Sequence, residues 1–196
     1  MTDETRIKAG VERIFADLNA CVQAVETMRP IVFEDKILAK FNGTYSAHVV
    51  TSLQDILRDH AIMTLCRMWD TDGDAHSILS VIESLPQQDS GKASHRKYDQ
   101  VGRIVRKMSA SGRLMRLRNW RNKYLGHALA KTRAEENKEI HPPTWDEIFV
   151  LYRRSGVIAE AIAVVAASLS FDRAEIQDLS ARNAKAFWGS FIDKPH

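Results

Sequence analysis

Cysteine is scarce in this sequence, because the 196 residues contain only Cys21 and Cys66. The two are not in C-x-x-C spacing and fall at positions that fit apolar helix faces. We therefore expect buried free thiols of a reducing compartment rather than a disulfide or a metal site. The N-terminal residues Met1–Arg6 also lack the apolar run of a signal peptide, so the expected location is the cytoplasm.

Motifs that bind metals or cofactors are missing as well. The nine glycines are scattered, and none forms the G-x-x-x-x-G-K loop that holds nucleotide phosphates. The seven histidines include no H-E-x-x-H pair. Asp70–Asp74 resembles the start of a calcium loop, but Ala75 and Val81 stand where that loop needs glycine and glutamate. We expect no metal and no cofactor.

Long hydrophobic segments are also absent. The apolar run Val157–Ser170 is interrupted by Glu160 and is shorter than the roughly 20 residues that span a bilayer. This run is expected to form a core helix, with no association with membranes.

The charge is mild, at a formal net value of +3. Such a value neither requires nor excludes a nucleic acid, so the distribution of the charges matters more than their sum. A hydrophobic content of 44% over 196 residues is enough to bury one core. The sequence predicts a single domain, residues 1–196.

Apolar residues recur at steps of three and four residues along most of the chain, whereas no segment shows the alternation of a strand. We predict an all-α, up-and-down helical bundle of about five to seven helices. The expected helices are 7–28, ended by Pro30; 31–41; 49–68, separated from the preceding one by Gly43; 78–85; 98–108; 114–131; 144–170, opened by a capping box; and a final one capped by Asp172.

The most informative stretch is Arg121–His127, where an arginine and an amide are followed by a histidine. An arginine can hold a phosphate, and a histidine can move a proton near neutral pH. Together they are the minimum needed to cut RNA without a metal. No other histidine follows an arginine by five to seven residues.

On a helical wheel Arg121 falls in the middle of an apolar stripe. A charge there is unfavourable unless it is paired or hydrated. Either Arg121 forms a salt bridge with Asp55, Asp59 or Asp70, or the stripe is a subunit interface. Because Arg121 and His127 are about 120° apart on an ideal helix, either the helix distorts near Gly126 or two protomers complete one site. The stripe consists of Leu114, Leu117, Tyr124, Leu125 and Ala128.

The opposite face of this helix is basic and carries one aromatic residue. Cations neutralise phosphates and an indole stacks on a base, so the face suits RNA, although a solvated helix face also has this composition. We predict that RNA binds at Arg113, Arg116, Arg118, Trp120 and Lys123.

The chain resembles the HEPN superfamily, whose signature is an arginine, a polar residue, a short spacer and a histidine in a helical bundle. Leu117–His127, taken with the earlier segment Leu65–Asp70, is most similar to the abortive-infection, AbiU-like branch. The resemblance implies a HEPN-like bundle that forms a homodimer and acts as a metal-independent endoribonuclease in phage defence. Arg121 would bind the scissile phosphate, Asn122 would orient the phosphate or the arginine, and His127 would transfer protons.

The resemblance leaves two further possibilities open. The chain could be a non-catalytic dimer that binds RNA or a partner protein, or the toxin of a toxin–antitoxin pair. Toxins of this superfamily that are silenced by modification often carry a tyrosine two residues after the histidine. Leu129 occupies that position here, so an antitoxin protein would have to act in another way.

Overall fold

The computed structural model describes residues 3–72, 76–85, 93–126, 141–167, 169 and 171–192. These residues form helices and connecting turns without a strand, which confirms the predicted all-α class. The described residues contain eight α-helices, which correspond in order to the eight segments expected from the periodicity, including the short α2 and α4. They are α1 (Asp3–Phe33), α2 (Asp35–Phe41), α3 (Ser46–Met68), α4 (Ile78–Glu83), α5 (Ala93–Ser109), α6 (Gly112–Trp120), α7 (Trp145–Ile162) and α8 (Arg173–Ile192), with π-helical segments η1 (Arg121–Gly126) and η3 (Ala163–Ala167).

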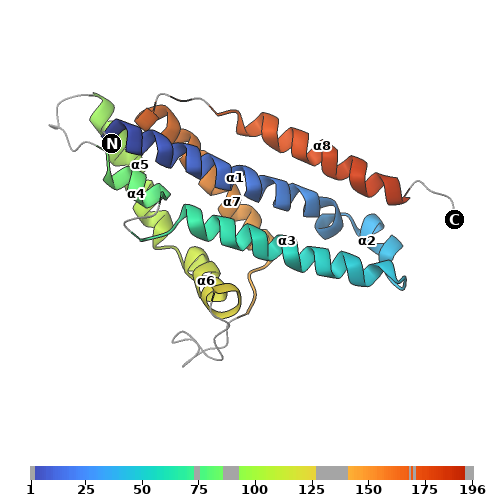
Figure 1. Cartoon of the computed structure of the whole chain (residues 1–196). Coiled ribbons are helices and arrows are strands. Elements are labelled where there is room, and N and C mark those ends of the chain that lie inside the picture. Colours follow the sequence, from blue (N-terminus) through green and yellow to red (C-terminus); the bar gives the residue numbers. More distant parts are fainter. Residues whose placement is uncertain are drawn as a thin grey trace.

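The long helix α1 lies at the centre of the bundle. It packs between α3 and α8 and also contacts α7. Figure 1 shows that α1 and α8 run in the same direction while α3 returns in the opposite one. Helix α5 begins at the end of the bundle that holds the N-terminus, and α6 follows it below α3 in the view of Figure 1. The chain therefore passes up and down the bundle, as predicted.

The prediction that Pro30 ends the first helix is wrong. Helix α1 continues to Phe33, and Pro30 is buried inside its last turn. Only three residues of α1 follow Pro30, so the missing N–H and the clash of its ring with the carbonyl four residues earlier affect only the end of the helix. The Pro30 carbonyl still accepts a hydrogen bond from the Glu34 amide at 3.0 Å.

Several predicted helix boundaries are confirmed by capping contacts. The hydroxyl of Thr144 accepts from the Glu147 amide, and the Glu147 side chain accepts from the Thr144 amide, which forms the predicted capping box of α7. The carboxylate of Asp172 accepts from the Glu175 amide at 2.9 Å at the start of α8. Between α2 and α3 the backbone of Gly43 has φ +78°, a conformation that favours glycine.

The main hydrophobic core is formed by α1, α3 and α7, together with residues of α4, α5 and α6. In the run from Val157 onward, Ile158, Ala159, Ile162 and Ala163 are buried, whereas Val157 and Val164 are exposed and the other described apolar residues are half-buried. In the described part of the chain, no helix has both the length and the apolar character needed to cross a membrane. The largest fully buried side chains include Trp69, Tyr152, Ile14, Leu18, Met28, Leu65, Leu114 and Leu117.

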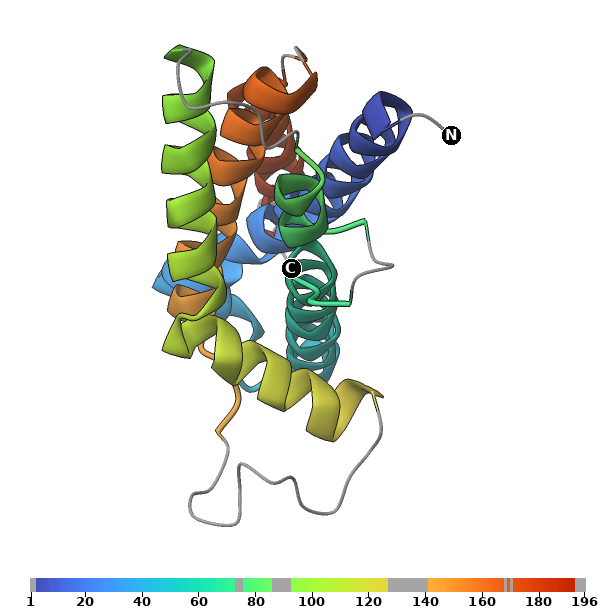
Figure 2. The same ribbon diagram turned by 90° about the vertical axis from the view of Figure 1, so that its left-hand side faces the viewer.

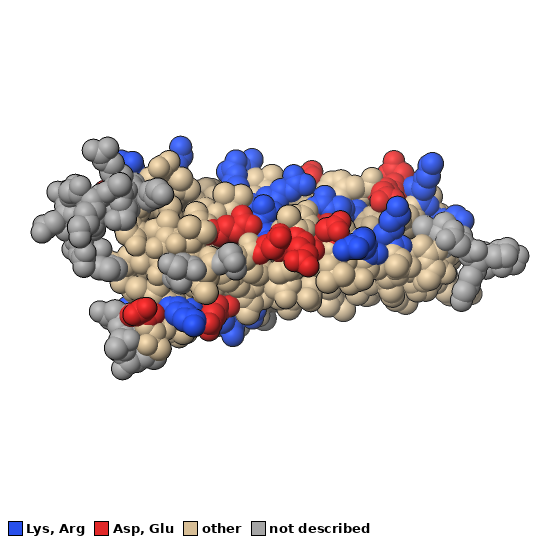
Figure 3. Space-filling view, turned by 90° about the horizontal axis from the view of Figure 1, so that it is seen from above, with Lys and Arg blue, Asp and Glu red and all other residues tan. Residues whose placement is uncertain are grey.

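One face of the molecule carries charged side chains of both signs. Figure 3 shows acidic and basic groups side by side along this face. This arrangement agrees with the mild net charge and gives that face no single-sign field to attract a polyanion.

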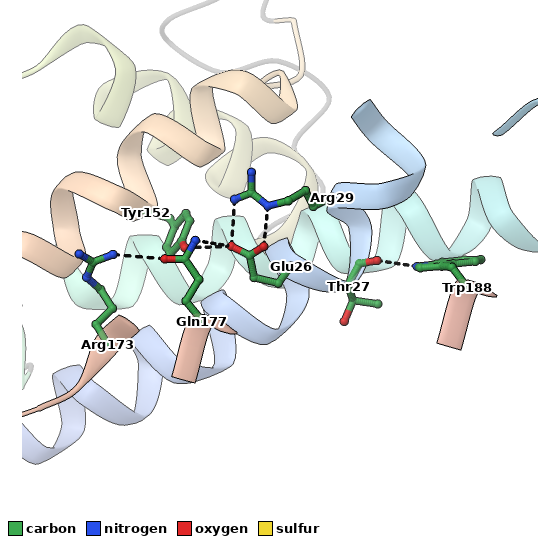
Figure 4. Close-up of polar contacts among 7 residues, drawn as sticks. All are labelled: Glu26, Thr27, Arg29, Tyr152, Arg173, Gln177 and Trp188. Carbon is green, nitrogen blue, oxygen red and sulfur yellow. Dashed lines mark hydrogen bonds and ion pairs between the residues drawn. The ribbon is translucent and has the colours of Figure 1, made fainter. Parts of the chain in front are cut away.

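A buried carboxylate, Glu26 of α1, joins three helices (Figure 4). Its oxygens accept hydrogen bonds from the Arg29 guanidinium, from the Tyr152 hydroxyl of α7 at 3.1 Å, and from the Gln177 amide of α8 at 3.0 Å. Only 1% of the Glu26 surface is exposed. Burial and the neighbouring carboxylate raise the pKa of Tyr152, which therefore stays protonated and donates.

Both cysteines are buried free thiols, as the sequence predicts. Burial disfavours the charged thiolate, which raises the pKa of Cys21 to about 12 and that of Cys66 to about 11. Neither thiol is therefore a nucleophile at neutral pH.

We expect the free energy of unfolding to fall by about 2–3 kcal/mol between pH 8 and pH 10 because of these two thiols. In the unfolded chain they ionise near the ordinary value of 9.0, whereas in the folded protein they keep their protons. The folded state then binds more protons, so stability is lost as the pH rises. Urea unfolding at both pH values measures the effect. A Cys21→Ala, Cys66→Ala double variant that shows an equal fall would contradict this assignment.

Candidate functional site

The predicted motif lies where the segment formed by α6 and η1 crosses α3 (Figure 2). Helix α6 begins after Ser111, whose hydroxyl accepts from the Leu114 amide. Leu114 and Leu117 are fully buried, as predicted for the apolar stripe. Burial of this stripe holds the segment against the core and fixes the position of the residues that follow.

The backbone changes at Arg121 from an α-helix to a π-helix, which continues to Gly126. A π turn pairs residues i and i+5 instead of i and i+4, and such turns are frequent at functional sites. A distortion near Gly126 was one of the two explanations expected from the helical wheel. Positions after Trp120 consequently do not follow the 100° steps of that wheel.

The Arg121 guanidinium is held in place by its neighbour Asn122. Nε and Nη2 of Arg121 both donate to Oδ1 of Asn122, at 3.0 and 2.8 Å. The Arg121 side chain is 26% exposed. Because a guanidinium has five N–H donors, this contact leaves other donors for a ligand.

The second partner of Arg121 is Asp70, which follows the end of α3. Nη1 of Arg121 lies 3.8 Å from Oδ2 of Asp70. Asp70 is one of the three acids that the sequence offers as a partner for this arginine. The observed geometry is a long contact between partly exposed groups, which orients the arginine more than it stabilises the fold.

The two sequence stretches that carry the HEPN resemblance meet at this point. Besides the Asp70 contact, the Arg118 guanidinium donates to the backbone carbonyl of Trp69 and, at 3.3 Å, to that of Ser109. The charges of Arg118 and Arg121 also act on Cys66, where they oppose the effect of burial on the thiol pKa. The end of α3 is therefore part of the candidate site.

Two of the predicted RNA-binding arginines have partners within the chain. Burial lowers the pKa of Arg118, and two of its donors bind the backbone carbonyls of Trp69 and Ser109, so its side chain anchors α6 to the end of α3. Nη1 of Arg116 lies 2.8 Å from Oε1 of Glu147 and ties α6 to the start of α7. Arg116 is still 51% exposed, and Arg113 is exposed on the same helix.

The aromatic residue on the exposed side is Tyr124 rather than Trp120. Trp120, predicted on the basic face, is half-buried and packs against the core. Tyr124, expected in the stripe, is 46% exposed. The two rings pack with centroids 4.0 Å apart, and the Lys123 ammonium lies 4.7 Å from the Tyr124 ring centre.

The predicted proton-transfer residue, His127, lies outside the described residues, as do Leu129 and the remainder of the motif helix expected to reach Lys131. The structure therefore describes Arg121 and Asn122 of the predicted catalytic set. The roles of all three residues stay predictions.

A polar cavity of about 350 Å³, which the sequence does not predict, lies beside Asp70. Its lining comes from three separated parts of the chain, so no local motif indicates it. The only sequence signals were the i,i+4 spacing of Arg13 and Asp17 and the position of Arg67 one turn before Asp70. The lining residues are Arg13, Asp17, Arg67, Asp70 and His76.

No group of three or more histidine, cysteine, aspartate or glutamate side chains could hold a metal ion within the described ranges. At the start of the Asp70–Asp74 stretch, the Asp70 carboxylate accepts a hydrogen bond from the Asp72 amide at 3.2 Å, a contact typical of turns. The family model of AbiU2, a HEPN family, matches residues 11–187. The chain belongs to the AbiU2 family.

This AbiU2 match spans both the Leu65–Asp70 stretch and the Arg121 motif. It agrees with the resemblance to abortive-infection HEPN proteins and with the all-α fold. No curated protein and no solved structure matches the chain. The contacts of this AbiU2 protein are therefore the basis for assigning roles to its residues.

Proposed function

We propose that this AbiU2 protein is a metal-independent endoribonuclease that acts as a homodimer and serves as a toxin-like effector of phage defence. The observation that carries the proposal is the position of the Arg121 guanidinium at the start of a π turn. Asn122 and Asp70 hold this guanidinium in place, and it keeps further N–H donors for a ligand. An arginine fixed in this way presents its remaining N–H groups to an oxyanion without further ordering.

The reaction that fits these residues is transesterification of RNA. The 2′-oxygen attacks the adjacent phosphorus, the bond from phosphorus to the 5′-oxygen breaks, and a 2′,3′-cyclic phosphate and a 5′-hydroxyl are formed. One base takes the proton of the 2′-OH, and one acid gives a proton to the leaving oxygen. Arg121 stabilises the negative charge that builds up on the phosphate oxygens.

The two proton transfers are assigned to His127 of each subunit in a dimer. A single motif supplies one histidine, whereas the reaction needs a base and an acid on opposite sides of the phosphorus. Exposed apolar side chains on elements that contact each other are consistent with an interface here: Ile56 of α3 is 63% exposed and Met115 of α6 is 56% exposed.

The expected result is that the wild-type protein cleaves RNA in the presence of EDTA and that His127→Ala slows cleavage by about 10²- to 10⁴-fold. The products are resolved by gel electrophoresis, and the cyclic phosphate is identified by its resistance to alkaline phosphatase until it is opened with acid. His48→Ala, an exposed histidine of α3, is the matched control and retains activity.

Three outcomes would contradict the proposal. They are loss of cleavage in EDTA, cleavage of a DNA oligonucleotide of the same sequence, and a His127→Ala variant that fails to fold or to sediment as a dimer. The last outcome would give the loss of activity a structural cause.

A groove between α5 and α7 supports a second candidate function, the binding of an antitoxin-like partner protein. The groove has a volume of about 490 Å³, and Ile104 and Val157 in it are 48% and 57% exposed. Its apolar floor and cationic rim suit an acidic amphipathic helix. A folded wild-type protein that cleaves no RNA would favour this function. The floor is formed by Ile104, Met108, Val157 and Ile158, and the rim by Lys107, Arg153 and Arg154.

A further inference from the structure

The polar cavity beside Asp70 is built from α1, the last turn of α3 and the segment that leads into α4. Its volume of about 350 Å³ is at the lower end of the range of small-molecule sites and is sufficient for a phosphate with part of a nucleotide. The side chains around it are charged or titratable rather than apolar, so the cavity is a site for a polar ligand.

Asp17 orients the two arginines of the cavity. This carboxylate is 5% exposed and accepts from Nε and Nη2 of Arg67 at 3.1 and 2.6 Å, while Nε of Arg13 lies 3.6 Å away. One buried acid therefore orients two guanidiniums. Arg13 and Arg67 are 54% and 44% exposed, which leaves part of each guanidinium accessible to a ligand.

Asp70 and His76 also line the cavity. The Ser77 hydroxyl donates to the Asp70 carbonyl at 2.8 Å, which holds the start of α4 and the neighbouring His76 close to Asp70. Helix α1 is close at this point, because a Cβ atom on Gly10 would lie 4.0 Å from Nδ1 of His76 and 2.6 Å from a methyl group of Val81. The absence of a side chain at Gly10 thus permits the approach of α4.

The cavity continues directly from the candidate catalytic arginine. Asp70 lines the cavity and is the acid that contacts Arg121, so the two sites share one carboxylate. Across both sites the three arginines 13, 67 and 121 outnumber the two aspartates 17 and 70, and the His76 ring adds a hydrogen-bonding nitrogen to the cavity. An anion is therefore the favoured ligand.

We propose that this cavity binds a phosphate of the RNA strand next to the scissile one. The inference rests on the proposed function, because it assumes that the scissile phosphate lies at Arg121. Arg13 and His76 are assigned as its binding residues, Asp17 positions Arg67, and Asp70 separates the two phosphates. Such a subsite fixes the direction in which the strand crosses the catalytic arginine.

The test measures binding without cleavage, with a fluorescein-labelled 2′-O-methyl RNA tetranucleotide that cannot be cut. Arg13→Gln and His76→Ala are each expected to weaken binding roughly tenfold, by fluorescence anisotropy at fixed ionic strength. Arg13→Gln leaves Asp17 paired with Arg67, so the buried carboxylate keeps its partner. The matched control is Arg182→Gln, which removes another i,i+4 arginine–aspartate pair on an exposed helix face.

Unchanged affinity in both folded variants would overturn the inference even if the wild type cleaves RNA. The proposed function fails separately, if the wild type binds the tetranucleotide but cuts no RNA. Inorganic phosphate and adenosine monophosphate form a second arm of the experiment. If they bind in a way that depends on His76 while the tetranucleotide does not, the cavity holds a free phosphate compound and the RNA subsite is rejected.

Discussion

Arg121→Ala is expected to slow RNA cleavage by about 10²- to 10³-fold, the effect of removing one oriented donor from a developing oxyanion. The reason is the geometry of the guanidinium, whose contacts with Asn122 and Asp70 fix it before the substrate arrives. Arg121→Lys is expected to recover little activity, since an ammonium ion keeps the charge but has no planar fork to bind Asn122 and a phosphate together. Initial rates on a labelled RNA measure both effects.

The stability of the Arg121→Ala protein provides the control for this experiment. A partly exposed ion pair at 3.8 Å contributes at most about 1 kcal/mol, so the variant should unfold close to the wild type. Arg103→Ala removes an exposed arginine of α5 and should leave the rate unchanged. If Arg121→Ala cleaved RNA at the wild-type rate, Arg121 would be only a structural residue.

The largest loss of stability from a single polar substitution is expected for Glu26→Ala, about 3 kcal/mol in the free energy of unfolding. Removal of this buried carboxylate leaves the hydroxyl of Tyr152 and the amide of Gln177 without their acceptor, at the junction of α1, α7 and α8. For a domain of this length the loss corresponds to a decrease of about 6–12 °C in Tm. Urea and thermal unfolding measure both quantities.

Two further variants test the origin of that loss. Glu26→Gln keeps an oxygen acceptor but lacks the charge that pairs with Arg29, so a loss of about half the size is expected. Asp178→Ala removes an exposed partner of Arg182 and should change stability by less than about 0.5 kcal/mol. Equal effects of Glu26→Ala and Asp178→Ala would mean that the buried cluster contributes nothing beyond a surface pair.

The parts of the fold that the sequence predicts correctly depend on local interactions. The capping box at Thr144, the cap at Asp172 and the turn at Gly43 each involve residues within a few positions of one another. The apolar periodicity likewise places Leu114 and Leu117 in the core. The sequence offers three acids as partners for Arg121. Only the fold selects Asp70 among them, because the end of α3 lies against η1.

The features that the sequence does not predict depend on contacts between distant residues or on small changes of helix geometry. The partners of Glu26 lie 126 and 151 positions away, at Tyr152 and Gln177. The π turn after Trp120 changes which residues share a face, so that Tyr124 is exposed contrary to the ideal wheel. The cavity beside Asp70 likewise combines residues of α1 and α3 that no motif connects.

The contact between Arg118 and the Trp69 carbonyl, 49 positions apart, limits how this site can be engineered. A helix that carries only the arginine–amide–histidine motif would lack the carbonyl that anchors Arg118 and the carboxylate that faces Arg121. Grafting the motif onto another scaffold would therefore require the last turn of α3 and the residue Asp70 as well. The smallest part of the protein that keeps these contacts when transferred to another scaffold is therefore a pair of crossing helices.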